Sequence, residues 1–508
     1  MALSRAIDEP DLVVEPAAGR ARSPLTRNLA YLAGGQLATW ILTAIWTVVV
    51  PRSLGPSGMG QLTIAWSAVA IVNVICAVGT DVLIARDIAR QHSRASTLVG
   101  AGILLRLASI PLGWVLVLAY IAATHFGPTQ ILVLVLATTA MQVALVTNVL
   151  QAAFQGIERM EYLAYADVFS KTLMTVASIV LVLTGFGVVA IMTLSLSIAM
   201  VVLVLVLRWS RAHFAVAWRV GWTELFTLLR GGLPFWATSL FLTAYIWIDS
   251  LMLGVMTDEK VVGWYGAPTK LFATLLFIPA VMSTAWFPRL VIAHSEGPQQ
   301  FRLALGKVLG WTVTLSLPIA AGLIAVSRPL IDLLYGVRFA ESAVVLAVLG
   351  MLLPFTYLNI IASQALAASN RQLRWTAIMA VATVVNPLLN LAAIPFFQSR
   401  WHDGAIGAAL SLLATEILMS FAALFLVRSS LAAVSGLRLV NTLLATLVMG
   451  GVAWLLAPLG IFVQVVAGGV TFIALAFLLR IPTSEEVASA VSFSRRFIGR
   501  LLASGATG

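Results

Sequence analysis

The chain has 508 residues, of which 60% are hydrophobic and only 10% are charged, and its mean hydropathy is +1.00. Soluble globular proteins contain roughly 45–50% apolar and about 25% charged residues, so this composition excludes a soluble domain and indicates a protein that lives in lipid. The net charge of +11 comes from arginines spread between apolar runs rather than gathered on one face, which argues against a nucleic-acid partner.

Apolar runs of about 20 residues, each long enough to cross a bilayer, predict an all-α polytopic membrane protein of about 14 transmembrane helices. The predicted spans are 28–50, 60–80, 98–122, 130–153, 164–185, 187–207, 233–256, 266–287, 304–325, 343–367, 374–394, 404–427, 439–457 and 460–480.

Basic residues set the orientation, because Lys and Arg near a span resist translocation. With both termini in the cytoplasm, most basic residues fall inside, and the predicted outer loops hold only Arg52, Lys260, Arg328, Arg338 and Arg400. The predicted parts are a cytoplasmic tail (1–26), a six-helix bundle (27–207), a cytoplasmic linker (208–232), a second six-helix bundle (233–428), two additional helices (429–480) and a second tail (481–508).

The two six-helix bundles show a weak internal repeat, since Gly60 and Gly263 each open a span after a short loop. Six spans per copy give both copies the same orientation. This predicts two pseudo-symmetric bundles related by an axis along the membrane normal, a layout common in secondary transporters.

Several other chemistries are disfavoured. Lys307 is followed by Val308, so no phosphate-binding loop is formed, and the histidines show no metal-ligand spacing. The single cysteine, Cys76, lies in an apolar run. We therefore expect no enzyme activity, no metal site and no bound cofactor, and a self-contained chain that works as a monomer.

Charged residues inside spans are the informative ones, because each costs roughly 2.5–3.5 kcal/mol to insert and usually faces the bundle interior. Arg106 and Glu416 lie deep in their spans, so they either line a wet cavity or form a buried structural ion pair. Lys171 follows Asp167 by four residues, which favours a self-neutralised pair. Lys270 is near a helix end and is able to snorkel.

Three further polar groups lie in spans seven and eleven. Asp249 follows Tyr245 by one helical turn, beside Trp247, and is suited to ligating a cation, carrying a proton or pairing with Lys270. Asn386 and Asn390 are one turn apart around Pro387. Such amides most often join helices to one another, for about 0.6–2 kcal/mol each.

The chain resembles the polysaccharide or oligosaccharide flippases of the MOP superfamily, which also holds the MATE drug exporters and the lipid II flippase. The loop Pro51–Gly60 is similar to the family's Arg-x-Leu-Gly-Pro-x-x-Tyr-Gly turn, with Met59 in place of the aromatic residue. The other similar segments are Gly79-Thr80, Ala85–Arg90, Phe154–Met160, Ile248–Gly254, Val262–Tyr265, Leu334–Gly336, Asn370-Arg371, Asn386–Asn390 and Gly404–Ala408.

This resemblance implies that the protein turns a polyprenyl-diphosphate-linked oligosaccharide from the inner to the outer leaflet of the bacterial plasma membrane by alternating access. It implies substrate contacts, with basic groups for the diphosphate and polar or aromatic groups for the sugar, at Arg106, Lys171, Lys270, Tyr245, Asn386 and Asn390. It implies coupling to a gradient of H⁺ or Na⁺ at Asp249 and Glu416. A MATE-like drug or cation antiporter and a lipid II flippase are the alternatives.

Overall fold

The computed structural model describes residues 25–482, with side chains from residue 42 onward. All regular structure in this part of the chain is helical, and 13 helical stretches are long and apolar enough to cross a membrane. The predicted all-α polytopic fold is confirmed. The predicted tails, 1–26 and 481–508, lie outside the described residues apart from their inner edges.

The helices follow the chain in three groups. The first half contains α1 (Leu25–Ala77), α2 (Thr80–Arg90), α3 (Ala95–Ala122), α4 (Pro128–Gly156), α5 (Met160–Leu183) and α6 (Val188–Ser210). The second half contains α7 (Trp222–Met256), α8 (Glu259–Leu275), α9 (Phe277–Glu296), α10 (Pro298–Ala325), α11 (Ser327–Leu334), α12 (Ser342–Ala368), α13 (Gln372–Trp401) and α14 (Gly404–Leu426). The short α15 (Arg428–Leu431) leads to α16 (Gly436–Leu455) and α17 (Ile461–Leu478).

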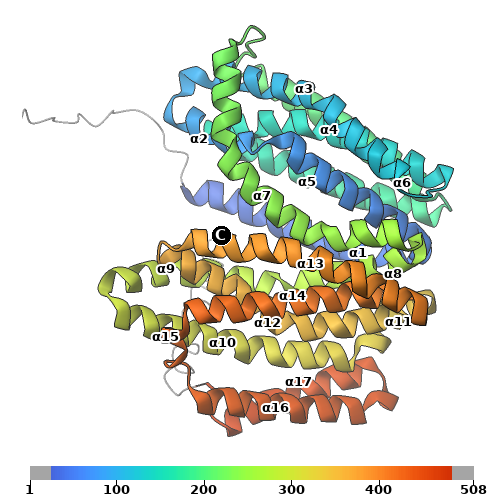
Figure 1. The fold of residues 1–508 in the computed structure, drawn as a ribbon, viewed down its shortest axis with the longest axis vertical. Coiled ribbons are helices and arrows are strands. Elements are labelled where there is room, and N and C mark those ends of the chain that lie inside the picture. The colour runs from blue at the N-terminus through green and yellow to red at the C-terminus, as the bar shows by residue number, and fades with distance from the viewer. Residues whose placement is uncertain (1–24, 483–508) are drawn as a thin grey trace, which may run out of the picture.

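The helix α1 contains both of the first two predicted spans. It breaks at Gly55, where φ is 74° and ψ is 179°, a left-handed conformation that glycine adopts without steric cost. Figure 1 shows α1 starting at the end of the molecule that holds α2 and returning to that end, so the chain reverses at this break. The 13 stretches are counted from Leu42 onward. With the first pass of α1 added, the count agrees with the prediction of about 14.

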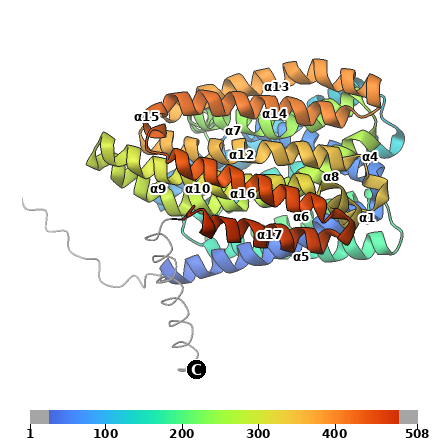
Figure 2. The same cartoon turned by 90° about the horizontal axis from the view of Figure 1, so that it is seen from below.

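The two halves form two layers of helices, with α7 crossing between them (Figure 1). We call the end that holds α2, α9 and α15 the α2 end, and the opposite end the α11 end. The connection between the halves is shorter than the predicted 208–232 linker: only residues 211–221 lie outside helices, because α6 continues to Ser210 and α7 begins at Trp222. Figure 2 shows α16 and α17 on the outer side of the second half, where α16 packs against α10.

At the α11 end the backbones of α1 and α8 touch. A Cβ atom added to Gly60 would lie 1.6 Å from the carbonyl oxygen of Glu259, and one added to Gly263 would lie 1.9 Å from that of Pro56. The two glycines that matched in the sequence repeat therefore face each other across the halves. Around them the largest buried apolar cluster joins α1 to α8, through side chains such as Leu62 and Val262.

At the α2 end the first half meets α7. A Cβ atom on Gly79 would lie 2.5 Å from the backbone nitrogen of Trp236, and one on Gly232 would lie 2.3 Å from the carbonyl oxygen of Val78. Arg94 and Glu224 add an ion pair of 2.8 Å between the α2–α3 turn and the start of α7. The first turns of α7 therefore belong to the first half in space, although they belong to the second half in sequence.

Candidate functional site

A cavity of about 440 Å³ lies mainly within the second half, between α7, α8, α12, α13 and α14. Most of its wall is apolar, as expected inside a membrane protein. Its polar lining consists of Thr63, Tyr245, Asp249, Ser250, Tyr265, Thr269, Lys270, Thr356, Asn359, Ser363 and Glu416. Thr63 comes from α1, so the cavity also touches the first half.

Asp249 of α7 is only 1% exposed, yet both of its carboxylate oxygens accept hydrogen bonds. The hydroxyl of Tyr265 in α8 donates to Oδ2 over 2.9 Å, and Nδ2 of Asn390 in α13 donates to Oδ1 over 2.6 Å. The same Nδ2 lies 3.1 Å from Oδ1 of Asn386. Three helices thus hold one buried acid, since a buried carboxylate is tolerated only when it is hydrogen-bonded or paired.

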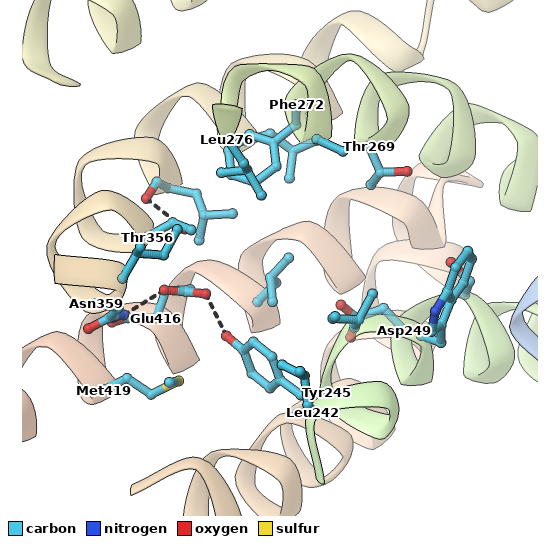
Figure 3. A pocket seen from close by; sticks show the side chains of 18 of the residues that line it. Leu242, Tyr245, Asp249, Thr269, Phe272, Leu276, Thr356, Asn359, Glu416 and Met419 are labelled. Atoms are coloured by element: carbon cyan, nitrogen blue, oxygen red, sulfur yellow. Dashed lines mark hydrogen bonds between the residues drawn. The ribbon is translucent and has the colours of Figure 1, made fainter. Parts of the chain in front are cut away.

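Glu416 of α14 has the same kind of surroundings and is 6% exposed. The hydroxyl of Tyr245 donates to Oε1 over 2.8 Å, and Nδ2 of Asn359 in α12 donates to Oε2 over 2.6 Å. Figure 3 shows Tyr245 and Asn359 approaching this carboxylate from opposite sides. Ser420 donates to Oδ1 of Asn359 over 3.1 Å and so fixes which way the amide points.

The two acids are therefore built alike, each with one tyrosine hydroxyl and one asparagine amide. Helix α7 takes part in both, because it supplies Asp249 to one set and Tyr245, one turn earlier, to the other. No cation lies within ion-pair distance of either acid among the described residues. Among the described side chains, no cluster of three His, Cys, Asp or Glu residues forms a metal site of protein ligands.

Lys270 lies in the cavity wall, between two tryptophan rings. Its Nζ atom is 4.7 Å from the ring centroid of Trp66 in α1 and 5.3 Å from that of Trp247 in α7. The side chain makes no ion pair with Asp249 within the described part of the chain, which removes the basis for the predicted pairing of these two residues. Aromatic faces attract an ammonium group without neutralising it as a carboxylate would.

Arg106 is 1% exposed and is not part of the cavity wall. Its guanidinium donates to Asp81 over 2.6 Å, to the hydroxyl of Thr80 over 2.8 Å, and to the carbonyl oxygens of Cys76 and Ala77. These groups form the turn between α1 and α2. Of the two interpretations that the sequence left open for Arg106, the contacts match the buried structural ion pair.

Lys171 and Asp167 form the predicted pair, with Nζ 2.9 Å from Oδ2 and with side chains 42% and 50% exposed. They line a second cavity of about 380 Å³ between α4, α5 and α6, together with Asn148 and Gln151. The structure therefore separates Lys171, in the first half, from Lys270, Tyr245 and the two acids in the second half. Asn386 and Asn390 lie behind Asp249 rather than in the cavity wall.

Sequence reasoning missed Tyr265 and Asn359 as partners of the acids. Asn359 is an amide in the middle of an apolar span. The rule that selected Asn386 and Asn390 would therefore have selected Asn359 as well. Tyr265 belongs to a segment that resembles the family, Val262–Tyr265, but nothing in the sequence distinguishes its hydroxyl from that of an ordinary core tyrosine.

Comparisons with known proteins agree with this architecture. The chain matches the family described as polysaccharide biosynthesis protein over residues 25–294, more than half of its length. It is 25% identical over 441 residues to a probable flippase, AglR, of Haloferax volcanii, with 84% of this chain and 88% of that one aligned.

Two solved structures share the fold. One is the lipid II flippase MurJ in an inward closed conformation, with a TM-score of 0.69 and 13% identity, covering 90% of this chain and 99% of that chain. The other is an inward-facing multidrug resistance MATE family transporter of the MOP superfamily, with a TM-score of 0.64 and 16% identity, covering 80% of this chain and 98% of that chain. At these identities the likeness shows the fold. The chain belongs to the polysaccharide biosynthesis protein family and has the fold of the MOP transporters, as its motifs predicted.

Proposed function

We propose that this protein flips a polyprenyl-diphosphate-linked oligosaccharide across the membrane by alternating access between its two halves. The family match and the relative described as a probable flippase support the substrate class. The observation that carries the mechanism is the cavity between α7, α8, α12 and α14, which holds two buried acids and one lysine near the meeting plane of the halves.

In this proposal the α2 end faces the cytoplasm of a bacterial cell and the α11 end faces outward. The distribution of basic residues supports this orientation. The backbone contact of Gly60 with Glu259 and of Gly263 with Pro56 then closes the outer end. Opening this contact and closing the α2 end would carry bound substrate from one leaflet to the other. A monomer contains both halves and so suffices.

Lys270 is the proposed contact of the diphosphate. It faces the cavity, and it is held by ring faces rather than by a carboxylate, so a phosphate oxygen has no acid to displace. Lys171 is a second, peripheral contact in the first half. Arg106 acts instead as a positioning residue for the α1–α2 turn, because all of its described hydrogen bonds are within its own half.

Asp249 and Glu416 are the proposed coupling residues for H⁺ or Na⁺. Oδ1 of Asn390 is buried and has no hydrogen-bond partner among the described residues, so an uncommitted oxygen lies beside the Asp249 carboxylate. Hard cations prefer such oxygen ligands. Tyr245, Asn386 and Asn390 then serve the acids rather than the sugar.

One observation favours a second candidate function, a drug or cation exporter of the same fold. The cavity holds two acids against one lysine, and its wall contains Tyr245, Trp247 and Tyr265, so an aromatic and net acidic lining is present. An organic cation would suit that lining. This alternative predicts export of cationic dyes and no dependence on Lys270.

Purified protein reconstituted in vesicles decides between these functions. Outward movement of a polyprenyl-diphosphate oligosaccharide is followed by its accessibility to a lectin outside the vesicle. We expect Lys270→Gln to slow this movement by at least about tenfold, the effect of losing one charge-assisted contact. Lys260→Gln is the matched control, since Lys260 also lies over a tryptophan, 4.9 Å from the Trp264 ring, but is outside the cavity. Dye transport without lipid movement would establish the exporter instead.

A further inference from the structure

A further polar pocket, of about 370 Å³, lies at the α2 end of the second half. Its wall is made by the end of α9, the start of α10, the turn after α12, and the segment where α14 passes into α15. It shares no residue with the cavity that holds Asp249 and Glu416. Figure 1 shows α9, α10 and α15 together at this end.

The polar lining of this pocket is entirely cationic or neutral. Arg302 from α10, Arg371 from the turn after α12 and His294 from α9 line it, together with Ser429 and Ser430. Ser369 also lines it, but its hydroxyl donates to the carbonyl oxygens of Ala365 and Leu366. No Asp or Glu contributes to the wall. The pocket therefore offers guanidinium groups from two separate segments and the hydroxyls of Ser429 and Ser430 from a third.

Among the described residues, neither arginine is neutralised by an acid, as is also true of Arg90 and Arg374, whereas three other arginines at this end are paired. Arg86, Arg94 and Arg159 each form an ion pair of 2.8–3.1 Å with an aspartate or glutamate. Arg302 and Arg371 form no ion pair within the part of the chain that the structure describes. No acidic side chain in the described part of the chain therefore pairs with either charge in this pocket.

The general excess of arginine on one side of a membrane explains why basic residues occur here, but not why two of them share one concave wall with three serines. A guanidinium holds phosphate oxygens bidentately through its fixed fork of N–H groups, and serine hydroxyls donate to the remaining oxygens. An inorganic cation finds no carboxylate in this lining. The chemistry points to a phosphate group.

Apolar side chains adjoin the polar part. Phe301, Leu426 and Val427 also line the pocket, and Ile292 of α9 and Phe425 of α14, on the adjoining helix ends, are 57% and 64% exposed. A phosphate carried by a lipid would find an apolar surface for its chains next to the cationic group, as basic pockets at helix ends do in other membrane proteins.

We propose that this pocket binds a phosphate group at the α2 end of the second half, separately from the transport cavity. The bound group crosslinks the ends of α10, α12 and α14 through Arg302, Arg371 and the serines. It therefore stabilises the second half as one rigid unit. A phospholipid headgroup and a soluble phosphate share this chemistry, and the experiment separates them.

The test uses the full chain purified in a neutral detergent. Three probes are added in turn: phosphatidylglycerol, inorganic phosphate and pyrophosphate. Lipid retention is measured by native mass spectrometry, and the thermal unfolding temperature is measured with each probe. The variant Arg302→Gln/Arg371→Gln is compared with Lys307→Gln/Arg374→Gln, which removes the same charge from α10 and from the segment after α12 but leaves the pocket lining intact.

We expect the first double variant to bind the effective probe at least about tenfold more weakly, and the control to bind as the wild type does. Arginine-dependent binding of phosphatidylglycerol alone identifies a lipid headgroup, and equal binding of inorganic phosphate or pyrophosphate identifies a soluble anion. Unchanged binding in the first variant, or an equal loss in the control, overturns the proposal. If the glutamine variant does not fold, Arg302→Lys/Arg371→Lys serves instead. Lysine keeps the positive charge but lacks the forked N–H groups of a guanidinium. Weaker binding in this variant supports the proposal, and unchanged binding overturns it.

Discussion

Arg338 donates a 2.8 Å hydrogen bond from Nη2 to the carbonyl oxygen of Arg52, and Arg52 donates one of 2.7 Å from Nη1 to the carbonyl oxygen of Leu333. Two like-charged residues from opposite halves therefore interlock at the α11 end. Their charges are accommodated because each donates to a backbone oxygen, and Leu333 belongs to the last turn of α11, where the helix dipole is negative. The guanidinium of Arg338 also covers Gly55, at 2.9 Å from the position of an added Cβ atom.

We expect Arg338→Ala to favour opening of the α11 end. The change removes one exposed hydrogen bond between the halves and the guanidinium contact over Gly55, which should shift the equilibrium by about 1 kcal/mol. Spin labels at Ser53 and Val337, in a background with Cys76 replaced by serine, report the distance between the halves. Arg328→Ala is the control, because Arg328 pairs with Asp332 four residues later in its own half, over 2.9 Å. An identical distance distribution in wild type and Arg338→Ala would show that the interlock does not hold this end closed.

Substitution of the contact glycines should have a larger effect. Gly60→Ala places a methyl group where the Glu259 carbonyl oxygen now lies, so α1 and α8 cannot meet as they do here. We expect the same spin-label pair to show a separated α11 end, or the unfolding temperature to fall by several degrees. Gly469→Ala in α17 is the control, since nothing lies within 4 Å of its added Cβ atom. A Gly60→Ala protein with wild-type distances, stability and transport would contradict the backbone contact.

Neutralising either buried acid should uncouple transport while leaving a folded protein. Asp249→Asn and Glu416→Gln keep the size of each side chain and remove the charge that a proton or cation must compensate. In vesicles, we expect lipid movement in these variants to lose its response to an imposed H⁺ or Na⁺ gradient. Asp81→Asn, which alters an acid in the first half outside the cavity, should retain that response. A gradient response that survives in both acid variants would remove these residues from the coupling proposal.

The substitution Arg106→Ala distinguishes a structural role of Arg106 from a role in substrate binding. The change leaves two backbone carbonyls and Asp81 without their donor, and we expect it to lower the free energy of unfolding by about 2–4 kcal/mol. Transport per folded molecule should stay near the wild-type value. The measurement combines thermal unfolding in detergent with transport normalised to the amount of folded protein. Normal stability with abolished transport would return Arg106 to the role of a substrate contact.

The stability of the α14 start should depend on pH through Asp403. Burial is the main cause that raises the pKa of this carboxyl to about 6; the nearby charge of Glu341 acts in the same direction, and the backbone N–H of Ala405 opposes the shift. An acid whose pKa is higher in the folded state loses stability as pH rises, here between about 4 and 6. Asp403→Asn keeps the cap and removes the charge. We therefore expect it to be more stable than wild type by about 1–3 kcal/mol at pH 7, with no difference at pH 4. A stability difference between Asp403→Asn and wild type that stays constant from pH 4 to pH 7 would contradict the raised pKa of Asp403.

Much of the fold followed from apolar run lengths alone, because a membrane helix must satisfy its backbone internally and be long enough to cross. Where prediction and structure differ, the cause is a tertiary contact between segments that are far apart in the sequence. Span seven begins earlier, at Trp222, since the polar turns that precede it are covered by contacts with Gly79 and Arg94 of the first half. No periodicity in the local sequence carries that information.

Charge inside a span was a good guide to the candidate site. It selected Asp249, Glu416 and Lys270, which the structure brings to one cavity. The same rule selected Arg106, which the structure places at a helix turn. The two cases look alike in sequence, because the rule states that a buried charge needs partners but does not say whether those are a ligand or the protein's own carbonyl oxygens. Only the packed neighbours distinguish them.

Helix α7 gives each acid one of its hydrogen-bonding groups: Asp249 is itself on α7, and Glu416 depends on Tyr245 one turn away. A helical turn is stiff, so any rotation or sliding of α7 changes both sets together. Binding of a proton or cation at one carboxylate then changes the affinity of the other carboxylate, although the two do not touch. The two acids should therefore bind their two protons, or one proton and one cation, together rather than independently.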